Sequence, residues 1–294
     1  MTKMEIETVL FDNGRKTEEY VREYFIGKDA PELIKSAISY SFFSGGKRIR
    51  PSLVIECGKT FGVDEMSLLP FAASVEMIHT YSLIHDDLPS MDNDDIRRGR
   101  PSNHKVFGEA QAILAGDALL NLSFEILMDK TDFTKPYITA AGYLYQKTGI
   151  CGMIGGQSLD MSTSDKRCDF TNLKKMHMMK TGALINACCI CPALLAQSED
   201  TVLSAIGRYA DDLGLIFQIT DDILDFTGSA KELGKTAGKD QSQNKQTYIT
   251  VYGHEKTLEI LNDRHESAIT ALDDIKADTS FLKEFAGFIK NRNH

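Results

Sequence analysis

The sequence predicts an all-α protein, because segments of helical length with an apolar period near 3.6 residues follow one another along the chain. Residues that favour helices, chiefly Ala, Leu, Met, Glu and Lys, dominate these segments. Strand signals are few, and the best of them, 247–252, is an isolated run that cannot form a sheet. The predicted helices are 32–42, 69–88, 108–128, 173–196, 202–226 and 257–272.

We expect one domain over residues 1–294, because the chain has no low-complexity linker and no short repeat. The stretch 112–122 is apolar on most faces and is expected to lie centrally. A net charge of −9 and a pI of about 5.3 argue against nucleic acid or an anionic membrane surface as the main partner.

The N-terminus has no apolar signal core, so a cytoplasmic location and no membrane insertion are expected. The longest apolar stretch, 183–196, is too short to span a bilayer. Cys188, Cys189 and Cys191 could suggest a metal site, but no second cysteine or histidine pair accompanies them. Buried core thiols in a reducing compartment are the favoured interpretation.

The most informative stretch is 85–98, in which five aspartates precede two arginines. Apolar sequence leads into this cluster, and Pro89 is expected to end the preceding helix near Leu88. A solvated acidic loop is the alternative to a metal site. The cluster consists of Asp86, Asp87, Asp92, Asp94 and Asp95, followed by Arg97 and Arg98.

A second carboxylate cluster, 135 positions after Asp86, favours the metal interpretation. Asp221 and Asp225 are four apart and share a helix face, where like charges destabilise the helix unless a cation compensates. Neither cluster shows a neutralising partner of its own in the sequence. Two such helices lining one cavity could hold magnesium, which takes few carboxylates and completes its shell with water and phosphate oxygens.

These motifs, taken together, resemble the trans-polyprenyl diphosphate synthase family. The resemblance rests on D-D-L-P-S-M-D with R-R-G-R-P, on D-D-I-L-D, and on G-G-K-R-I-R-P, K-T-G-A and L-G-K-T, which occur in the family's order over about residues 30 to 250. It implies a large antiparallel helical bundle around a central cavity, and condensation of isopentenyl diphosphate with an allylic diphosphate. It further implies a homodimer through helices near 108–127 and about three magnesium ions, with manganese as a possible substitute.

The same resemblance implies a role for each matching residue. The metal ligands would be Asp86, Asp92 and Asp221, with Asp87 and Asp225 in support. Isopentenyl diphosphate would be bound by Gly46, Lys47, Arg50, His79 and Arg98, although an exposed basic turn and a core histidine are alternatives. The allylic diphosphate would meet Arg97 and Lys180, and Lys235 would be a further diphosphate ligand. The carbonyl of Lys180 with Thr181 and Gln218 would face the developing carbocation. Gln157 and Asp160 resemble a polar pocket segment.

Product length is expected to depend on the residues one turn before the first cluster. Tyr81 and Ser82 stand five and four residues before Asp86, and only the Tyr81 ring is large enough to close a channel, unless it is simply a core residue. The resemblance then implies farnesyl diphosphate as product, with a geranylgeranyl diphosphate synthase as the alternative.

Other classes are disfavoured. A terpene cyclase needs no second diphosphate clamp, and a non-catalytic partner subunit would have lost aspartates or clamp arginines. A calcium-sensor loop starting at Asp92 fails because Arg97 stands where glycine is needed and Asn103 where glutamate is needed.

Overall fold

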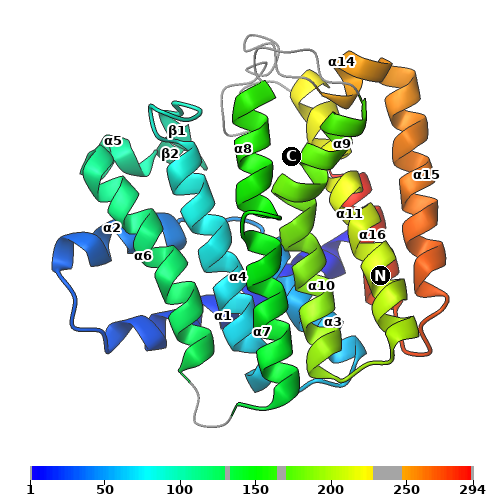
Figure 1. The fold of residues 1–294 in the computed structure, drawn as a ribbon, viewed down its shortest axis with the longest axis horizontal. Coiled ribbons are helices and arrows are strands. Elements are labelled where there is room, and N and C mark those ends of the chain that lie inside the picture. Colours follow the sequence, from blue (N-terminus) through cyan, green and yellow to red (C-terminus); the bar gives the residue numbers. More distant parts are fainter. Residues whose placement is uncertain (1, 130–132, 164–169, 228–246, 293–294) are drawn as a thin grey trace. The chain divides into compact units, whose positions relative to one another are not determined.

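Helices form nearly all of the regular structure, so the all-α prediction is confirmed (Figure 1). The computed structural model describes residues 2–129, 133–163, 170–227 and 247–292. The chain divides into two compact units. The N-terminal unit comprises Glu7–Ile55 and Asp64–Phe133, and the C-terminal unit comprises Met1–Ile6, Glu56–Val63 and Thr134–His294.

The N-terminal unit is organised around the pairing of α4 with α6. Asp64 caps α4 by accepting a hydrogen bond from the Ser67 amide at 3.0 Å, and the helix ends three residues before Pro89, as predicted. The elements are α1 (Lys3–Ile26) and α3 (Ile49–Thr60), which both continue into the other unit, α2 (Glu32–Phe42), α4 (Glu65–Asp86), β1 (Ile96–Arg97), β2 (Arg100–Pro101), α5 (Asn103–Phe107) and α6 (Glu109–Met128).

The C-terminal unit has α10 at its core, where it packs against α7 and α11. Every residue of α10 from Ala183 to Ala193 is buried. The elements are α7 (Lys135–Thr148), α8 (Met153–Thr163), α9 (Phe170–His177), the π-helical turn η1 (Met178–Gly182), α10 (Ala183–Leu195), α11 (Asp200–Thr227), α14 (Tyr248–Tyr252), α15 (His254–Leu272) and α16 (Ser280–Lys290).

The segment 247–252, the best of the few strand signals, folds as the short helix α14, in agreement with the expectation that it forms no sheet. Thr247 and Thr250 form a reciprocal capping box at its start, and Gly253, with φ of 76°, ends it. The buried Asp222 carboxylate accepts a hydrogen bond from the Tyr248 backbone amide at 2.7 Å. These caps satisfy the free amides of the first turn and outweigh the β-branched and aromatic composition of the segment.

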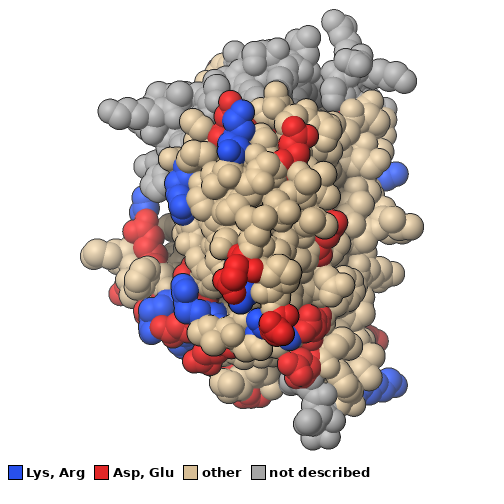
Figure 2. Space-filling model, turned by 90° about the vertical axis from the view of Figure 1, so that its left-hand side faces the viewer, with Lys and Arg blue, Asp and Glu red and all other residues tan. Residues whose placement is uncertain are grey.

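The central position expected for 112–122 is wrong within the N-terminal unit. One face of α6 is buried, while its other face leaves Ile113, Leu114, Phe124 and Met128 between 42% and 51% exposed. Uncharged residues cover much of the surface seen in Figure 2. Large apolar side chains gathered on one exposed helix face are typical of an interaction surface.

Two helical stretches, Glu109–Met128 and Asn172–Leu195, are long and apolar enough to cross a membrane by length and composition alone. The second is longer than the stretch 183–196 that we expected to be too short, because α9, η1 and α10 run on without a break. The core helices of soluble proteins pass the same test, and 67% of the most apolar part of this stretch is buried inside the protein.

The core interpretation of the cysteine cluster is confirmed. Cys188, Cys189 and Cys191 are at most 1% exposed within α10, and each is a thiol that is not part of a disulfide. Burial raises the pKa of the Cys191 thiol far above its ordinary value, which keeps it protonated.

Candidate active site

The first aspartate cluster forms a loop that folds back on the end of α4. The Asp92 amide donates a hydrogen bond to the Asp86 carbonyl at 2.8 Å, and the Asp94 amide donates to the Asp87 carbonyl at 3.1 Å. Asn93 takes a φ of 51°, a left-handed conformation that asparagine tolerates better than most residues. The Pro-Ser-Met segment between the aspartates therefore brings Asp86 and Asp92 together.

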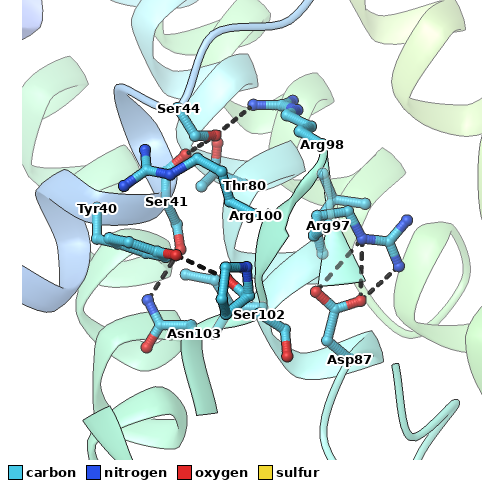
Figure 3. Close-up of a pocket in the computed structure, with 13 residues that line it drawn as sticks. Tyr40, Ser41, Ser44, Thr80, Asp87, Arg97, Arg98, Arg100, Ser102 and Asn103 are labelled. Atoms are coloured by element: carbon cyan, nitrogen blue, oxygen red, sulfur yellow. Dashed lines mark hydrogen bonds and ion pairs between the residues drawn. The ribbon is translucent and has the colours of Figure 1, made fainter. Parts of the chain in front are cut away.

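Asp87 is the buried member of the first aspartate cluster. Its carboxylate accepts hydrogen bonds from Nε and Nη2 of Arg97, the first at 3.0 Å, and only 3% of its side chain is exposed (Figure 3). Burial raises the pKa of Asp87, although the Arg97 guanidinium opposes the shift. A fork of this kind fixes the plane of the guanidinium, so Asp87 anchors Arg97.

A pocket between α2, α4 and the β1–β2 hairpin lies beside this pair (Figure 3). Arg97, Arg98 and Arg100 line it, and the Arg100 guanidinium lies 4.2 Å from the centre of the Tyr40 ring. The hairpin thus delivers three cations to the end of α4, where the aspartate cluster begins.

Several of the residues predicted to bind isopentenyl diphosphate lie close together in the N-terminal unit. Arg50 Nη1 lies 3.3 Å from His79 Nε2, and Arg98 donates to Ser44 Oγ at 3.1 Å and to the Gly45 carbonyl. A Cβ atom on Gly46 would lie 3.0 Å from the Arg98 guanidinium carbon, so the close approach of backbone and arginine requires glycine there.

The electrostatics of this group fix the charge of His79. Burial and then the charges of Arg50 and Arg98 hold the pKa of His79 well below its ordinary value. The imidazole is therefore neutral at physiological pH. The Lys47 side chain, between Gly46 and Arg48 in the same loop, is partly buried.

The second aspartate cluster lies on α11 in the C-terminal unit. Asp221 forms an ion pair of 2.6 Å with Arg292, whose guanidinium also stacks 3.9 Å from the centre of the Phe217 ring and donates to the Phe217 carbonyl at 2.9 Å. Asp225 stands one turn further along α11 and is partly buried.

Both clusters therefore have a neutralising partner, contrary to our expectation. Arg97 forms an ion pair with Asp87, and Arg292 forms one with Asp221. The second partner could not be read from the sequence, because it lies 71 positions away and follows no motif.

The predicted carbocation-facing residues Thr181 and Gln218 are in contact. Thr181 Oγ1 donates to Gln218 Oε1 at 3.1 Å, and Gln218 Nε2 donates to Asp222 at 3.0 Å. Asp222, which we had assigned no role, therefore orients Gln218 while it caps α14.

Lys180 lies in the π-helical turn and pairs with Asp160 at 2.6 Å. Both polar atoms of the neighbouring Gln157 side chain are buried without a hydrogen-bond partner among the residues that the structure describes. Buried amides are rarely left unpaired, so this one points to a ligand or water. Gly156 packs on the backbone of the turn, since a Cβ atom at this position would lie 2.2 Å from the backbone nitrogen of Lys180.

The remaining predicted residues differ in their surroundings. Tyr81 is 6% exposed and packs edge-on against the His85 ring at 5.8 Å, while Ser82 Oγ donates to the His79 carbonyl at 2.9 Å. Lys235 lies outside the described residues. No group of three or more metal-ligating side chains forms among the described residues, each unit holding its own carboxylates.

Comparison with known proteins identifies the family. The family model described as polyprenyl synthetase matches residues 31–279, which is most of the chain. The chain belongs to the polyprenyl synthetase family. Its resemblance through five short motifs is thereby confirmed over the whole length that carries them.

Individual relatives give the same picture. The chain is 38% identical to a farnesyl diphosphate synthase of Geobacillus stearothermophilus, over 100% of both chains. It is 44% identical to a chloroplastic geranylgeranyl pyrophosphate synthase of Arabidopsis thaliana, over 80% of this chain and 70% of that one. Among solved structures, a geranyltransferase from Legionella pneumophila matches with a TM-score of 0.86 and 34% identity over 99% of both chains.

Proposed function

We propose that this polyprenyl synthetase condenses isopentenyl diphosphate with dimethylallyl or geranyl diphosphate and forms farnesyl diphosphate. The observation that carries the proposal is the folded-back loop that joins Asp86 to Asp92 beside Arg97 and Arg98. It places hard oxygen donors and phosphate-binding guanidiniums at one helix end, which is the combination that a metal-bridged diphosphate needs.

The carboxylates present fit magnesium. Asp86 and Asp92 are joined through a backbone hydrogen bond, and Asp221 and Asp225 lie one helical turn apart, so each unit offers a pair of oxygen donors. Magnesium bound there, in about three ions, would neutralise charge on the departing diphosphate.

The chain's own cations would assist the same step. Lys180, which Asp160 holds in the π-helical turn, and Arg97, which Asp87 holds in its plane, would bind the allylic diphosphate and stabilise it as the C–O bond breaks. The backbone carbonyl of Lys180 and the paired Thr181 and Gln218 would present partial negative charge to the allylic cation. The buried Gln157 amide would gain a partner in the bound state.

Isopentenyl diphosphate would be held by Lys47, Arg50, neutral His79 and Arg98 in the N-terminal unit. Its double bond would attack the allylic cation, and a proton would pass to the released diphosphate. No dedicated protein base is needed.

The full-length match to a farnesyl diphosphate synthase and the buried aromatic ring of Tyr81 support the fifteen-carbon product. The match to a geranylgeranyl pyrophosphate synthase supports the twenty-carbon alternative. The exposed apolar face of α6 supports a homodimer, and we propose that the dimer is cytoplasmic.

A product assay tests the proposal. Purified protein is incubated with magnesium, labelled isopentenyl diphosphate and one primer at a time, and the chain length of the product is measured. We expect a fifteen-carbon product from the five-carbon and ten-carbon primers. A twenty-carbon product would support the alternative, and no incorporation of label with any primer would refute prenyl transfer.

A further inference from the structure

Arg48 lies in the basic segment 45–50, one residue before α3 begins. Its side chain is 3% exposed and forms an ion pair with Glu76 of α4, also 3% exposed. Its Nε donates to Glu18 of α1 at 2.8 Å, and its Nη2 donates to the Phe42 carbonyl at the end of α2. One side chain thus joins the loop to three helices.

The charge of Arg48 is fixed by these partners. Burial alone would lower the pKa of its guanidinium, but the charges of Glu76 and then Glu18 outweigh burial and leave the pKa above its ordinary value. Arg48 is therefore a permanent cation held between carboxylates.

The backbone of the loop is held in conformations that most residues avoid. Gly45, Gly46 and Arg48 have φ angles of 82°, 120° and 48°. Glycine adopts such angles freely, but the backbone of arginine is strained there. The contacts of the Arg48 side chain must therefore hold its backbone in place. On α1, a Cβ atom on Gly14 would lie 2.7 Å from Arg48 Cγ, so the helix leaves room for this arginine.

The arrangement also fixes the register of the loop against α4. Glu76 and His79 are three residues apart on α4 and therefore share one face of the helix. Glu76 contacts Arg48, and His79 contacts Arg50. Glu76 and His79, about one turn apart on α4, thus contact Arg48 in the loop and Arg50 in the first turn of α3.

We propose that Arg48 and Glu76 are a positioning pair that holds Lys47 and Arg50 in place to bind isopentenyl diphosphate. The inference rests on the proposed function, because it concerns the site assigned to that substrate. A buried ion pair contributes little to stability relative to a well-packed apolar pair, so its role here is to specify geometry. A purely structural role is the competing interpretation.

The decisive variant is the double substitution Arg48→Met with Glu76→Leu. It removes the two deeply buried charges together, and Glu18, the carboxylate that loses its partner, is 29% exposed and can be hydrated, so the fold is expected to survive. We expect the KM for isopentenyl diphosphate to rise at least tenfold, while kcat and the KM for geranyl diphosphate change less than threefold. A folded double variant with wild-type KM values would overturn the proposal.

A second variant keeps the test decisive should the double variant fail to fold. Arg48→Lys retains a cation beside Glu76 but cannot contact Glu76, Glu18 and the Phe42 carbonyl together. We expect a severalfold rise in the KM for isopentenyl diphosphate alone, in a variant that remains folded at the assay temperature. Wild-type KM values in this folded variant would count against positioning.

Two further variants separate this inference from the function beneath it. Arg15→Met with Glu19→Leu removes an exposed ion pair of 2.8 Å on α1 and should leave all constants unchanged. Arg50→Gln should raise the KM for isopentenyl diphosphate. If Arg50→Gln has no such effect, the assignment of the substrate site is wrong; if it has the effect and the Arg48 variants do not, only the positioning inference fails.

Discussion

Among individual side chains, neighbouring residues with similar chemistry have different tasks. Asp87 is buried against Arg97, whereas Asp86 and Asp92 form the folded-back loop at the surface of the same helix end. Arg48 holds the basic loop to α1 and α4, whereas Arg50 contacts His79. Burial and partners, not residue type, separate these roles.

Tyr81 offers a test of product length. Its ring packs against His85 and its hydroxyl is buried without a partner among the described residues, so Tyr81→Phe keeps the ring and breaks no hydrogen bond among them. We expect Tyr81→Ala to shift the product to twenty carbons or more, and the matched control Tyr81→Phe to keep fifteen. Product chain length by radio-chromatography checks both; an unchanged length in Tyr81→Ala would mean that another residue closes the cavity.

Helices as units show why the sequence predicts some features and not others. The helix 32–42 was predicted with its observed bounds, because apolar spacing and a preceding proline mark it clearly. The π-helical turn at 178–182 was missed, because the apolar pattern runs on through it. Its cause lies in packing, since Gly156 and Gly214 each approach its backbone so closely that a Cβ would overlap.

Substitution of Gly156 tests the role of this turn. A Cβ atom at this position would lie 2.2 Å from the backbone nitrogen of Lys180. Gly156→Ala should therefore displace the turn, lower the melting temperature and reduce kcat at least tenfold. Gly142→Ala in α7 is the matched control, because nothing lies within 4 Å of its Cβ. It should retain activity and gain about 0.5–1 kcal/mol of stability. The melting temperature and kcat are measured for both variants. Wild-type values of both quantities in Gly156→Ala would contradict the proposed role of the turn.

For the complete chain, the motifs predicted which residues gather within each unit, but not their partners. Arg50 with His79, and Thr181 with Gln218, come together as expected. The Arg292–Asp221 pair could not be predicted, because ion pairs distant in sequence leave no local pattern. The single domain, the metal ligands and the role of Lys235 stay predictions.

Stability should depend on pH through His177. Burial lowers its pKa to about 4, so below about 6.5 the unfolded chain binds a proton that the folded chain does not. Stability is therefore lost as the pH falls from about 6.5 to 4. Between pH 7 and 5 this amounts to about 2 kcal/mol, at about 1.4 kcal/mol per unit.

The variant His177→Phe should lose about 2 kcal/mol less than wild type over that interval, measured by urea unfolding at both values. His254→Gln changes an exposed histidine, and the pH dependence of its unfolding free energy should equal that of wild type. Equal pH dependence in wild type and His177→Phe would show that His177 is not responsible.

Assembly can be tested on the apolar face of α6. Leu114→Glu puts a charge on that face, where Leu114 is 51% exposed, and should convert a dimer of twice 32.7 kDa to a monomer. Leu33→Glu on α2, at 52% exposure, should leave the mass unchanged. Light scattering gives the masses, and an active wild-type monomer would reject the dimer.

The most direct measurement is the initial rate of farnesyl diphosphate formation from labelled isopentenyl diphosphate and geranyl diphosphate, with magnesium and with excess chelator, for wild type, Asp86→Ala and Asp221→Ala. We expect activity from wild type with magnesium, none in chelator, and a loss of several powers of ten in each variant, since Asp86 and Asp221 are both predicted metal ligands. Full activity of wild type in chelator, or of either variant with magnesium, would contradict the account.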